Sequence, residues 1–131
     1  MEGLTAAARK NGVTVAYEAR ALSLISDDDG IKGVRVRYKG KTVEVACKCV
    51  VLAAGGFQAN AEMRTRYLGP GWELAKVRGT RFNTGDGIRM ALDIGAQPTG
   101  NWSGSHAVGW DRNAPEFGDL EVGDNFQKHN Y

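Results

Sequence analysis

Few residues in this sequence could staple or stiffen its fold. It has two cysteines and three prolines among 131 residues. Cys47 and Cys49 are spaced i, i+2 on a predicted strand, so they share one face and are badly directed for a mutual disulfide. Without a nearby histidine or a second cysteine pair, they also make a poor zinc site. We expect no metal site and interpret both thiols as small buried side chains in a reducing compartment.

Net charge and long apolar runs are also scarce. The net charge is +2 at pH 7, which gives no reason to expect a nucleic acid or an anionic membrane surface as partner. No apolar run approaches the roughly 18 residues of a membrane-spanning helix, and no charged leader with a small-residue cleavage site begins the sequence. These absences predict a cytoplasmic protein with no membrane span and no nucleic-acid partner.

Several phosphate-binding and catalytic motifs are missing as well. The sequence contains neither the fingerprint G-x-G-x-x-G after an opening strand nor the phosphate loop G-x-x-x-x-G-K-[ST]. It also lacks the G-x-S-x-G nucleophile turn and the His-Glu-x-x-His zinc motif. Nothing in the sequence therefore supports a self-contained hydrolase, kinase or metalloenzyme.

Glycine is what the sequence has in quantity, with 18 residues, most of them at predicted turns. Between these turns, apolar residues recur with a helical period and predict helices over 3–11, 60–68 and 88–95. From residue 97 onward the sequence has no clear period, and we expect a loop-rich segment.

Strands are predicted wherever apolar and polar residues alternate. The alternation favours strands at 13–17 and 21–25, and a β-hairpin of 34–38 and 43–47 with one wet, basic face. Residues 49–54 are apolar without alternation, which is typical of a strand buried on both faces of a parallel sheet. Together these elements predict an α/β fold.

Two glycine motifs, about thirty residues apart, carry the functional argument. Gly55 and Gly56 end the predicted buried strand, where glycine lets a flat or anionic ligand approach the backbone N–H groups. The alternative is a tight strand-to-helix turn without any ligand.

The second motif is Thr84-Gly85-Asp86-Gly87, at the start of a predicted amphipathic helix. The Thr84 hydroxyl can cap this helix, and Asp86 in its first turn suits the positive end of the helix dipole. A well-capped helix is one sufficient explanation. The functional alternative is that Asp86 binds a ribityl or ribose hydroxyl group, as acidic residues do in dinucleotide sites.

A polar loop at 101–107 follows the last predicted helix. Its Ser103, Ser105 and His106 offer hydrogen-bond donors that suit an anionic substrate. The alternative is an ordinary surface histidine in a Gly/Ser loop. We expect Trp72, Trp102 and Trp110 to pack locally rather than to stack on a cofactor.

Taken in order, these motifs resemble the flavoprotein family of fumarate reductases and succinate dehydrogenase flavoprotein subunits. The resemblance is carried by the apolar run into Gly-Gly-Phe-Gln-Ala-Asn at 55–60 and by Asn-Thr-Gly-Asp-Gly-Ile at 83–88. The loop over 100–112, Gly-Asn-Trp-Ser-Gly-Ser-His-Ala-Val-Gly-Trp-Asp-Arg, is similar to that of FAD-dependent tricarballylate dehydrogenases within this family.

The resemblance implies FAD as cofactor and assigns roles to individual residues. The implied cofactor-binding residues are Ala21, Ala54, Gly55, Gly56, Thr84 and Asp86. His106 matches the histidine that these enzymes direct at a substrate carboxylate, and Ser103 and Ser105 are its implied neighbours in the substrate pocket.

The resemblance also implies that the chain is an internal piece of a longer flavoprotein. Residues 1–99 would be the later part of a Rossmann-like FAD-binding domain with an inserted antiparallel β-meander. Residues 100–131 would begin a capping domain that contacts the substrate. The family's opening glycine fingerprint is missing, its catalytic arginine is expected beyond Tyr131, and Ala54 stands where many relatives carry threonine.

We therefore expect the parent protein to dehydrogenate a C–C bond of a tricarballylate-like tricarboxylate or dicarboxylate. Its partners would be this small carboxylate and the rest of the flavoprotein. Two alternatives stay open: a ketosteroid-type flavin dehydrogenase, and a non-catalytic folding or interaction module. We expect the chain alone to be inactive, because FAD affinity needs both halves of the site, and to present a sheet edge beside 50–54 through which it could self-associate.

Overall fold

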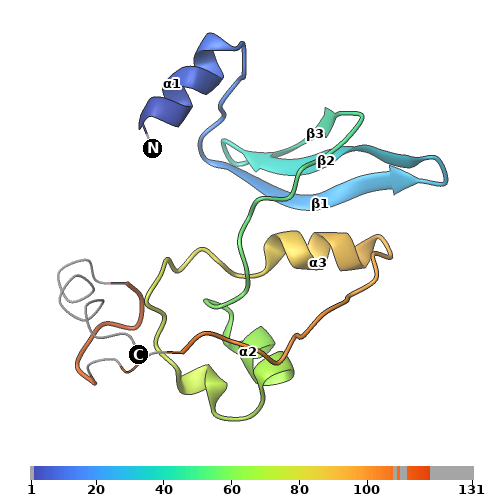
Figure 1. Cartoon of the computed structure of the whole chain (residues 1–131). Helices are drawn as coiled ribbons and strands as arrows, with labels where there is room; N and C mark the ends of the chain where they lie inside the picture. Colours follow the sequence, from blue (N-terminus) through green and yellow to red (C-terminus); the bar gives the residue numbers. More distant parts are fainter. Residues whose placement is uncertain (1, 108, 110–111, 119–131) are drawn as a thin grey trace. The chain divides into compact units, whose positions relative to one another are not determined.

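The protein is described by a computed structural model that covers residues 2–107, 109 and 112–118 (Figure 1). These residues fall into two compact units, Met1–Val50 and Val51–Tyr131. The predicted domain boundary between 1–99 and 100–131 is not tested by this division and stays a prediction. In the described part of the chain, no helix is both long enough and apolar enough to cross a membrane.

The first unit begins with helix α1 (Glu2–Lys10), where the sequence predicts a helix over 3–11. Its last turn carries the cations Arg9 and Lys10. Their positive charge interacts favourably with the negative end of the helix dipole. The Ala7 carbonyl then accepts two hydrogen bonds from Asn11, one from the backbone amide at 3.1 Å and one from the side-chain Nδ2 at 2.8 Å.

An antiparallel sheet of three strands follows α1 in this unit, with the order β1-β2-β3 (Figure 1). The strands are β1 (Ala19–Asp27), β2 (Gly30–Tyr38) and β3 (Lys41–Ala46). Val34 pairs with Val45 and Val36 with Val43, so the predicted strand at 21–25 and the hairpin are confirmed. Arg35 and Arg37 are exposed, as predicted for the basic face. A single wet face is wrong for β3, which is exposed along its whole length, with Val43 and Val45 at 38% and 51%.

The strand predicted at 13–17 is wrong. These residues are not assigned to a strand, and the side chains of Val13 and Tyr17 are 53% and 64% exposed. Alternation creates a strand only where a second strand supplies the ladder hydrogen bonds. In the part of the chain that the structure describes, no strand pairs with this segment.

The buried strand predicted at 49–54 is also wrong. The segment has no strand assignment, and Val51 is 87% exposed. Cys49 is exposed and Cys47 half-buried, both as free thiols, so the expectation of two buried cysteines fails. A non-alternating strand needs neighbours on its edges and cover on both faces. Among the described residues no strand runs beside segment 49–54, so these residues form no Rossmann-like sheet. Self-association through an edge at this segment stays a prediction.

The second unit contains two α-helices and a short 3₁₀-helix. Helix α2 (Ala61–Leu68) and helix α3 (Asp86–Asp93) lie where the sequence predicts them, and η1 (Trp72–Leu74) falls in the segment between them. The buried apolar side chains of the described residues all lie in this unit: Met63, Val77, Met90 and Ala114. The loop-rich character expected beyond residue 97 is confirmed for its described residues.

Candidate functional site

The two glycine motifs meet in the second unit. The Gly85 amide donates to the Gly56 carbonyl at 3.0 Å, and the Ala59 amide donates to the Asn83 carbonyl at 2.9 Å. These hydrogen bonds join backbone segments separated by more than twenty residues of sequence. The structure thus brings together the two motifs that the sequence singles out.

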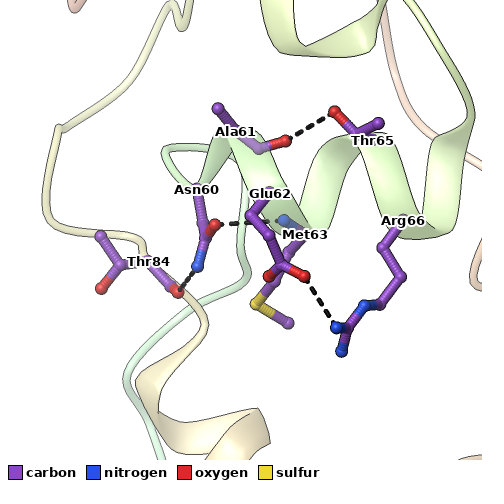
Figure 2. A network of polar contacts seen from close by, with 7 residues as sticks. All are labelled: Asn60, Ala61, Glu62, Met63, Thr65, Arg66 and Thr84. Atoms are coloured by element: carbon purple, nitrogen blue, oxygen red, sulfur yellow. Dashed lines mark hydrogen bonds and ion pairs between the residues drawn. The ribbon is translucent and has the colours of Figure 1, made fainter.

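Asn60 ties this junction to helix α2 (Figure 2). Its Oδ1 accepts the Met63 amide hydrogen at 3.1 Å, which caps the helix, while its Nδ2 donates to the Thr84 carbonyl at 2.9 Å. One side chain therefore satisfies a free N–H at the helix start and fixes the second motif. This role of Asn60 was not predicted, although an asparagine immediately before a helical period is a recognisable N-cap signal.

The chain segments at this junction pack so closely that two positions require glycine. Gly55 and Gly85 have φ values of +72° and +80°, a region that residues with a Cβ rarely adopt. A Cβ at Gly55 would lie 2.7 Å from Asn83 Oδ1, and one at Gly85 would lie 3.0 Å from the Cβ of Phe57. The glycines therefore have a packing function whether or not a ligand is bound.

The predicted capping role of Thr84 is wrong. The N-cap of α3 is Gly85 in a left-handed conformation, with no side-chain hydrogen bond to the helix. Only glycine fits beside Phe57 at the cap position, which Gly85 occupies. Thr84 therefore lies one residue before the cap, and its carbonyl accepts a hydrogen bond from Asn60. Asp86 does lie in the first turn of α3 and is half-buried. Its negative charge there interacts favourably with the positive end of the helix dipole.

Helix α3 also borders the chain that leads into the first motif. A Cβ at Gly87 would come within 3.3 Å of the Cβ of Ala54, so the first turn of the helix passes close to this segment. Ala54 and Gly55 are exposed and Gly56 is half-buried. The chain at this point therefore carries only small side chains and an accessible backbone.

A cavity of about 840 Å³ opens next to this junction. Gly56 of the first motif, Ile88 of α3, and Ser105 and His106 of the polar loop all line it. The structure therefore groups three of the predicted site residues, Gly56, Ser105 and His106, around one space. Its volume is within the usual range of ligand pockets, about 300–1,000 Å³.

The other six predicted site residues do not line this cavity. Four of them, Ala54, Gly55, Thr84 and Asp86, lie at the junction of the glycine motifs, and the remaining two are Ser103 and Ala21. The Ser103 hydroxyl donates to Asn101 Oδ1 at 2.9 Å and its amide to the same oxygen at 3.1 Å, so Ser103 shapes the loop and does not line the cavity. Ala21 is part of β1 in the first unit, paired with Val36 next to a register shift. Its predicted cofactor contact is not tested by this grouping.

Four cationic side chains line the cavity, and the sequence analysis missed all of them. They are Arg64, Lys76, Arg78 and Arg112, and no aspartate or glutamate is among the described lining residues. Lys76 and Arg78 are spaced i, i+2, which on an extended chain directs two side chains to one face. That spacing was a usable signal. The proximity of Arg112 was not, because it depends on contacts across more than thirty residues of sequence.

Arg64 is buried, with 6% of its surface exposed, and it organises one wall of the cavity. Its guanidinium donates to the Trp72 carbonyl at 2.8 Å and the Glu73 carbonyl at 2.9 Å, and also to those of Gln58 and Ala75. A buried charge is tolerated only when its donors are satisfied. Arg64 therefore holds the turn around η1 in place.

Two further segments at the cavity pair with each other. The Val77 amide donates to the Glu116 carbonyl at 2.8 Å, and the Gly118 amide donates to the Val77 carbonyl at 2.9 Å. The Lys76 ammonium donates to the carbonyls of Arg112 and Ala114. This pairing fixes the backbone of 76–79 against 112–118.

Glu73 is the one described residue whose pKa is clearly shifted. A hydrogen bond from its own backbone N–H lowers the pKa of this carboxyl most strongly. Desolvation opposes this, while the Thr65 hydroxyl, the Gly71 amide and the charge of Arg64 lower the pKa further. The carboxylate thus stays ionised and holds the turn between α2 and η1.

An aromatic cluster fixes the start of the polar loop. The Trp102 ring lies 4.8 Å from that of Tyr67 on α2 and stacks on Phe57 at 6.5 Å between centroids. In Figure 1 this loop (orange) passes beside α2 (green). Local packing is therefore confirmed for Trp102, whereas Trp110 lies outside the described residues.

Comparisons with known proteins agree with this reading of the motifs. Residues 1–107 match the model of a protein family described as an FAD binding domain. A 4-oxocyclohexanecarboxylate 2-dehydrogenase from Sinomonas cyclohexanicum is 35% identical over 127 residues, covering 89% of this chain and 21% of that protein. A probable fumarate reductase from Shewanella frigidimarina is 33% identical over 109 residues, or 81% of this chain and 18% of that protein.

Solved structures of flavoenzymes are similar as well. The open conformation of a flavocytochrome c3 fumarate reductase matches with a TM-score of 0.68 at 33% identity, over 73% of this chain and 17% of the other. A 3-ketosteroid Δ1-dehydrogenase from Sterolibacterium denitrificans, solved with 1,4-androstadiene-3,17-dione, matches with a TM-score of 0.66 at 35% identity, over 72% and 18%. The chain spans about a fifth of the length of these proteins.

Proposed function

The chain belongs to the FAD binding domain family, and on this premise we propose that it supplies one wall of the FAD and substrate site of a longer flavoprotein oxidoreductase. FAD is the cofactor of this family, and the relatives are named as dehydrogenases and fumarate reductases. The observation that carries the proposal is the junction of the two glycine motifs beside the cationic cavity.

The residues at the junction fit the edge of a flavin nucleotide. Ala54 and Gly55 present exposed backbone with no side chain larger than a methyl group, so a planar ring system can lie against them. Asp86 offers a carboxylate to a ribityl or ribose hydroxyl, and Thr84 a second polar group. In this proposal Ala21 adds a backbone contact. When bound, FAD supplies the hydride chemistry, and the residues of this chain position it.

The substrate we propose is a small carboxylic acid, and more specifically one that resembles tricarballylate. His106 and Ser105 line the cavity together with four cationic residues, and such groups attract and orient carboxylates. His106 would also act as the acid–base group at the carbon that loses or gains a proton, because an imidazole can both donate and accept one. The names of two relatives, with 4-oxocyclohexanecarboxylate and fumarate, refer to carboxylic acids.

A ketosteroid substrate is the second candidate, for a specific reason. A 3-oxosteroid 1-dehydrogenase of Mycobacterium tuberculosis is 32% identical over 94 residues, and the solved relative at 35% identity contains a steroid. The cavity also has apolar lining from Leu68, Trp72 and Ile88. The charge of the cavity favours the acid, since a steroid diketone offers no anion to four cations.

Substitution of His106 tests the carboxylate proposal. In the full-length flavoprotein, His106→Ala should lower turnover of tricarballylate about 100-fold or more, the usual contribution of a positioned acid–base group. The FAD content, read from the absorbance ratio of flavin to protein, should stay at the wild-type level. His106→Gln keeps a donor and should recover binding more than turnover. Normal turnover by His106→Ala would refute the role of this residue.

Flavin binding by the isolated chain tests the other open alternative, a non-catalytic folding or interaction module. We propose that the 131 residues alone bind FAD weakly, because they provide only part of the contact area. Titration of the chain with FAD, followed by flavin fluorescence, should show no tight complex. A yellow chain that retains FAD through gel filtration would contradict this. A cytoplasmic location stays a prediction.

A further inference from the structure

We propose that Arg78 and Arg112 act together as carboxylate anchors in the cavity, so that it selects substrates with two or more carboxylate groups. This proposal rests on the proposed function and deepens it. It singles out two of the four cations that line the cavity. It also separates an acid-specific site from a steroid site more sharply than the presence of His106 does.

Arg64 is not an anchor, because its donors are already used. The guanidinium is buried and donates to the backbone carbonyls of Gln58, Trp72, Glu73 and Ala75. A substrate carboxylate would have to displace these bonds and leave several carbonyls unsatisfied, which is costly in a buried place. Arg64 is therefore a positioning residue for the turn around η1.

Lys76 is used in a similar way. Its ammonium donates to the carbonyls of Arg112 and Ala114, and an ammonium group has only three donors. Lys76 thus joins the segment that carries Arg78 to the segment that carries Arg112. Its main effect on the substrate is indirect, through the position of these two arginines.

Arg78 and Arg112 differ from the first pair. Their backbones are held by neighbouring hydrogen bonds, at Val77 for one and at the carbonyl bound by Lys76 for the other. Within residues 2–107, 109 and 112–118, no hydrogen bond or ion pair engages either guanidinium. A fixed backbone with a free planar fork is well suited to bidentate carboxylate binding.

The electrostatics of the cavity point the same way. Its described lining has four cations and no acidic side chain, so these residues favour an anion. The guanidinium groups of Arg78 and Arg112, which no described residue engages, can each hold one carboxylate, while His106 and Ser105 line the same space. A dicarboxylate or tricarboxylate satisfies both arginines, whereas a monocarboxylate leaves one without an anion.

The test compares acids of increasing charge on matched variants. The full-length flavoprotein and its Arg78→Gln and Arg112→Gln variants are titrated calorimetrically with propionate, succinate and tricarballylate at one pH and one ionic strength. Each variant should bind tricarballylate at least 10-fold more weakly, since hydrogen bonds to charged groups contribute that much. Propionate affinity should change less than 3-fold. The control is Arg66→Gln, the same change at a surface ion pair with Glu62, and it should leave all affinities unchanged.

Each outcome decides between the two proposals. If the acids bind and both variants match the wild type, the anchors are refuted while the proposed function stands. If no acid binds the wild type, or androstenedione binds in its place, both proposals fail. Should a glutamine variant lose its FAD or fail to fold, Arg78→Lys and Arg112→Lys replace it. They keep the charge but lose the planar fork, and tricarballylate affinity unchanged in both would overturn the anchors.

Discussion

The two units of this chain are stabilised by different means. In the first, strands that are neighbours in sequence pair with each other, β1 with β2 and β2 with β3, and none of the described apolar side chains is buried. In the second, motifs far apart in sequence meet through backbone hydrogen bonds, and four apolar side chains are buried. The candidate site lies where such long-range contacts meet.

This difference shows what each unit can contribute to function. A hairpin ladder forms from local contacts and tolerates changes on its wet face. The junction of the glycine motifs has no such tolerance, because backbone, cap and cavity wall depend on the same few contacts. Substitutions of one type should therefore have unequal effects in the two units, and paired variants can measure this.

The largest contrast is expected between two glycines with almost the same backbone conformation. Gly85 in the second unit has φ +80°, and Gly40 in the β2–β3 turn has φ +77°. A Cβ at Gly85 would clash with the Met63 sulfur and with Phe57, whereas one at Gly40 would meet nothing within 4 Å. Gly85→Ala should cost about 3 kcal/mol from conformation and overpacking together, and Gly40→Ala about 1 kcal/mol from conformation alone.

Urea unfolding of the chain measures this contrast. Tryptophan fluorescence follows the second unit, in which Trp72 and Trp102 lie, and far-ultraviolet circular dichroism follows the whole chain. Equal losses for the two alanine variants would show that crowding at Gly85 has no energetic weight. The second unit would then be no more sensitive to this substitution than the first.

A second contrast uses two asparagines that both bond to the backbone near a helix end. Asn60 links the start of α2 to Thr84, whereas Asn11 bonds only to Ala7 at the exposed end of α1. Asn60→Ala should cost about 1–2 kcal/mol, because it removes a cap and a part-buried bond. Asn11→Ala should cost less than about 0.5 kcal/mol, as surface substitutions do.

Hydrogen exchange locates these losses. Asn60→Ala should speed exchange at the amides of Met63 and Gly85 and leave the β2–β3 ladder unchanged. If exchange rises equally in both units, Asn60 acts on the whole chain and not on the junction. An Asn60→Asp variant keeps the cap acceptor but loses the donor to Thr84, and should fall between the other two.

The same division explains which features the sequence could predict. Helices α1, α2 and α3 and the hairpin follow from local periodicity, so their residues could be assigned in advance. The strands at 13–17 and 49–54 could not, because a strand exists only where a partner supplies hydrogen bonds, and apolar residues alone do not show whether one is present. The result is an exposed Val51 where burial was expected.

The candidate site was predictable to a similar extent. Gly56, Ser105 and His106 were found from local motifs, and the structure brings them to one cavity. The role of Asn60 was readable from its position before a helix. The proposed anchor role of Arg78 and Arg112 was not readable from the sequence. These residues differ from Arg64 and Lys76 because the latter two donate to backbone carbonyls, and such contacts depend on the tertiary structure.

Acid should weaken the second unit before the first, through Glu73. The folded-state pKa of this carboxyl is lowered from 4.5, so its ionised form stabilises the fold above that value. This contribution is lost as the pH falls from 4.5 through the lowered pKa. Trp72 fluorescence should therefore change at a higher pH than the sheet signal in circular dichroism. Glu73→Gln should remove the difference, and an acid transition unaltered by this substitution would contradict it.

The smallest effects are expected at two exposed ion pairs, one in each unit. Arg35 and Glu44 pair across β2 and β3 at 2.8 Å, and Arg66 and Glu62 pair along α2 at 2.8 Å. Both pairs are solvated, so double-mutant cycles with alanine should give coupling energies below about 1 kcal/mol, decreasing with added salt. Here the two units should behave alike, because a surface pair depends on its solvent exposure and not on the contacts beneath it. A coupling above about 2 kcal/mol at Arg66–Glu62 alone would show that the stiffness of the second unit extends to its surface.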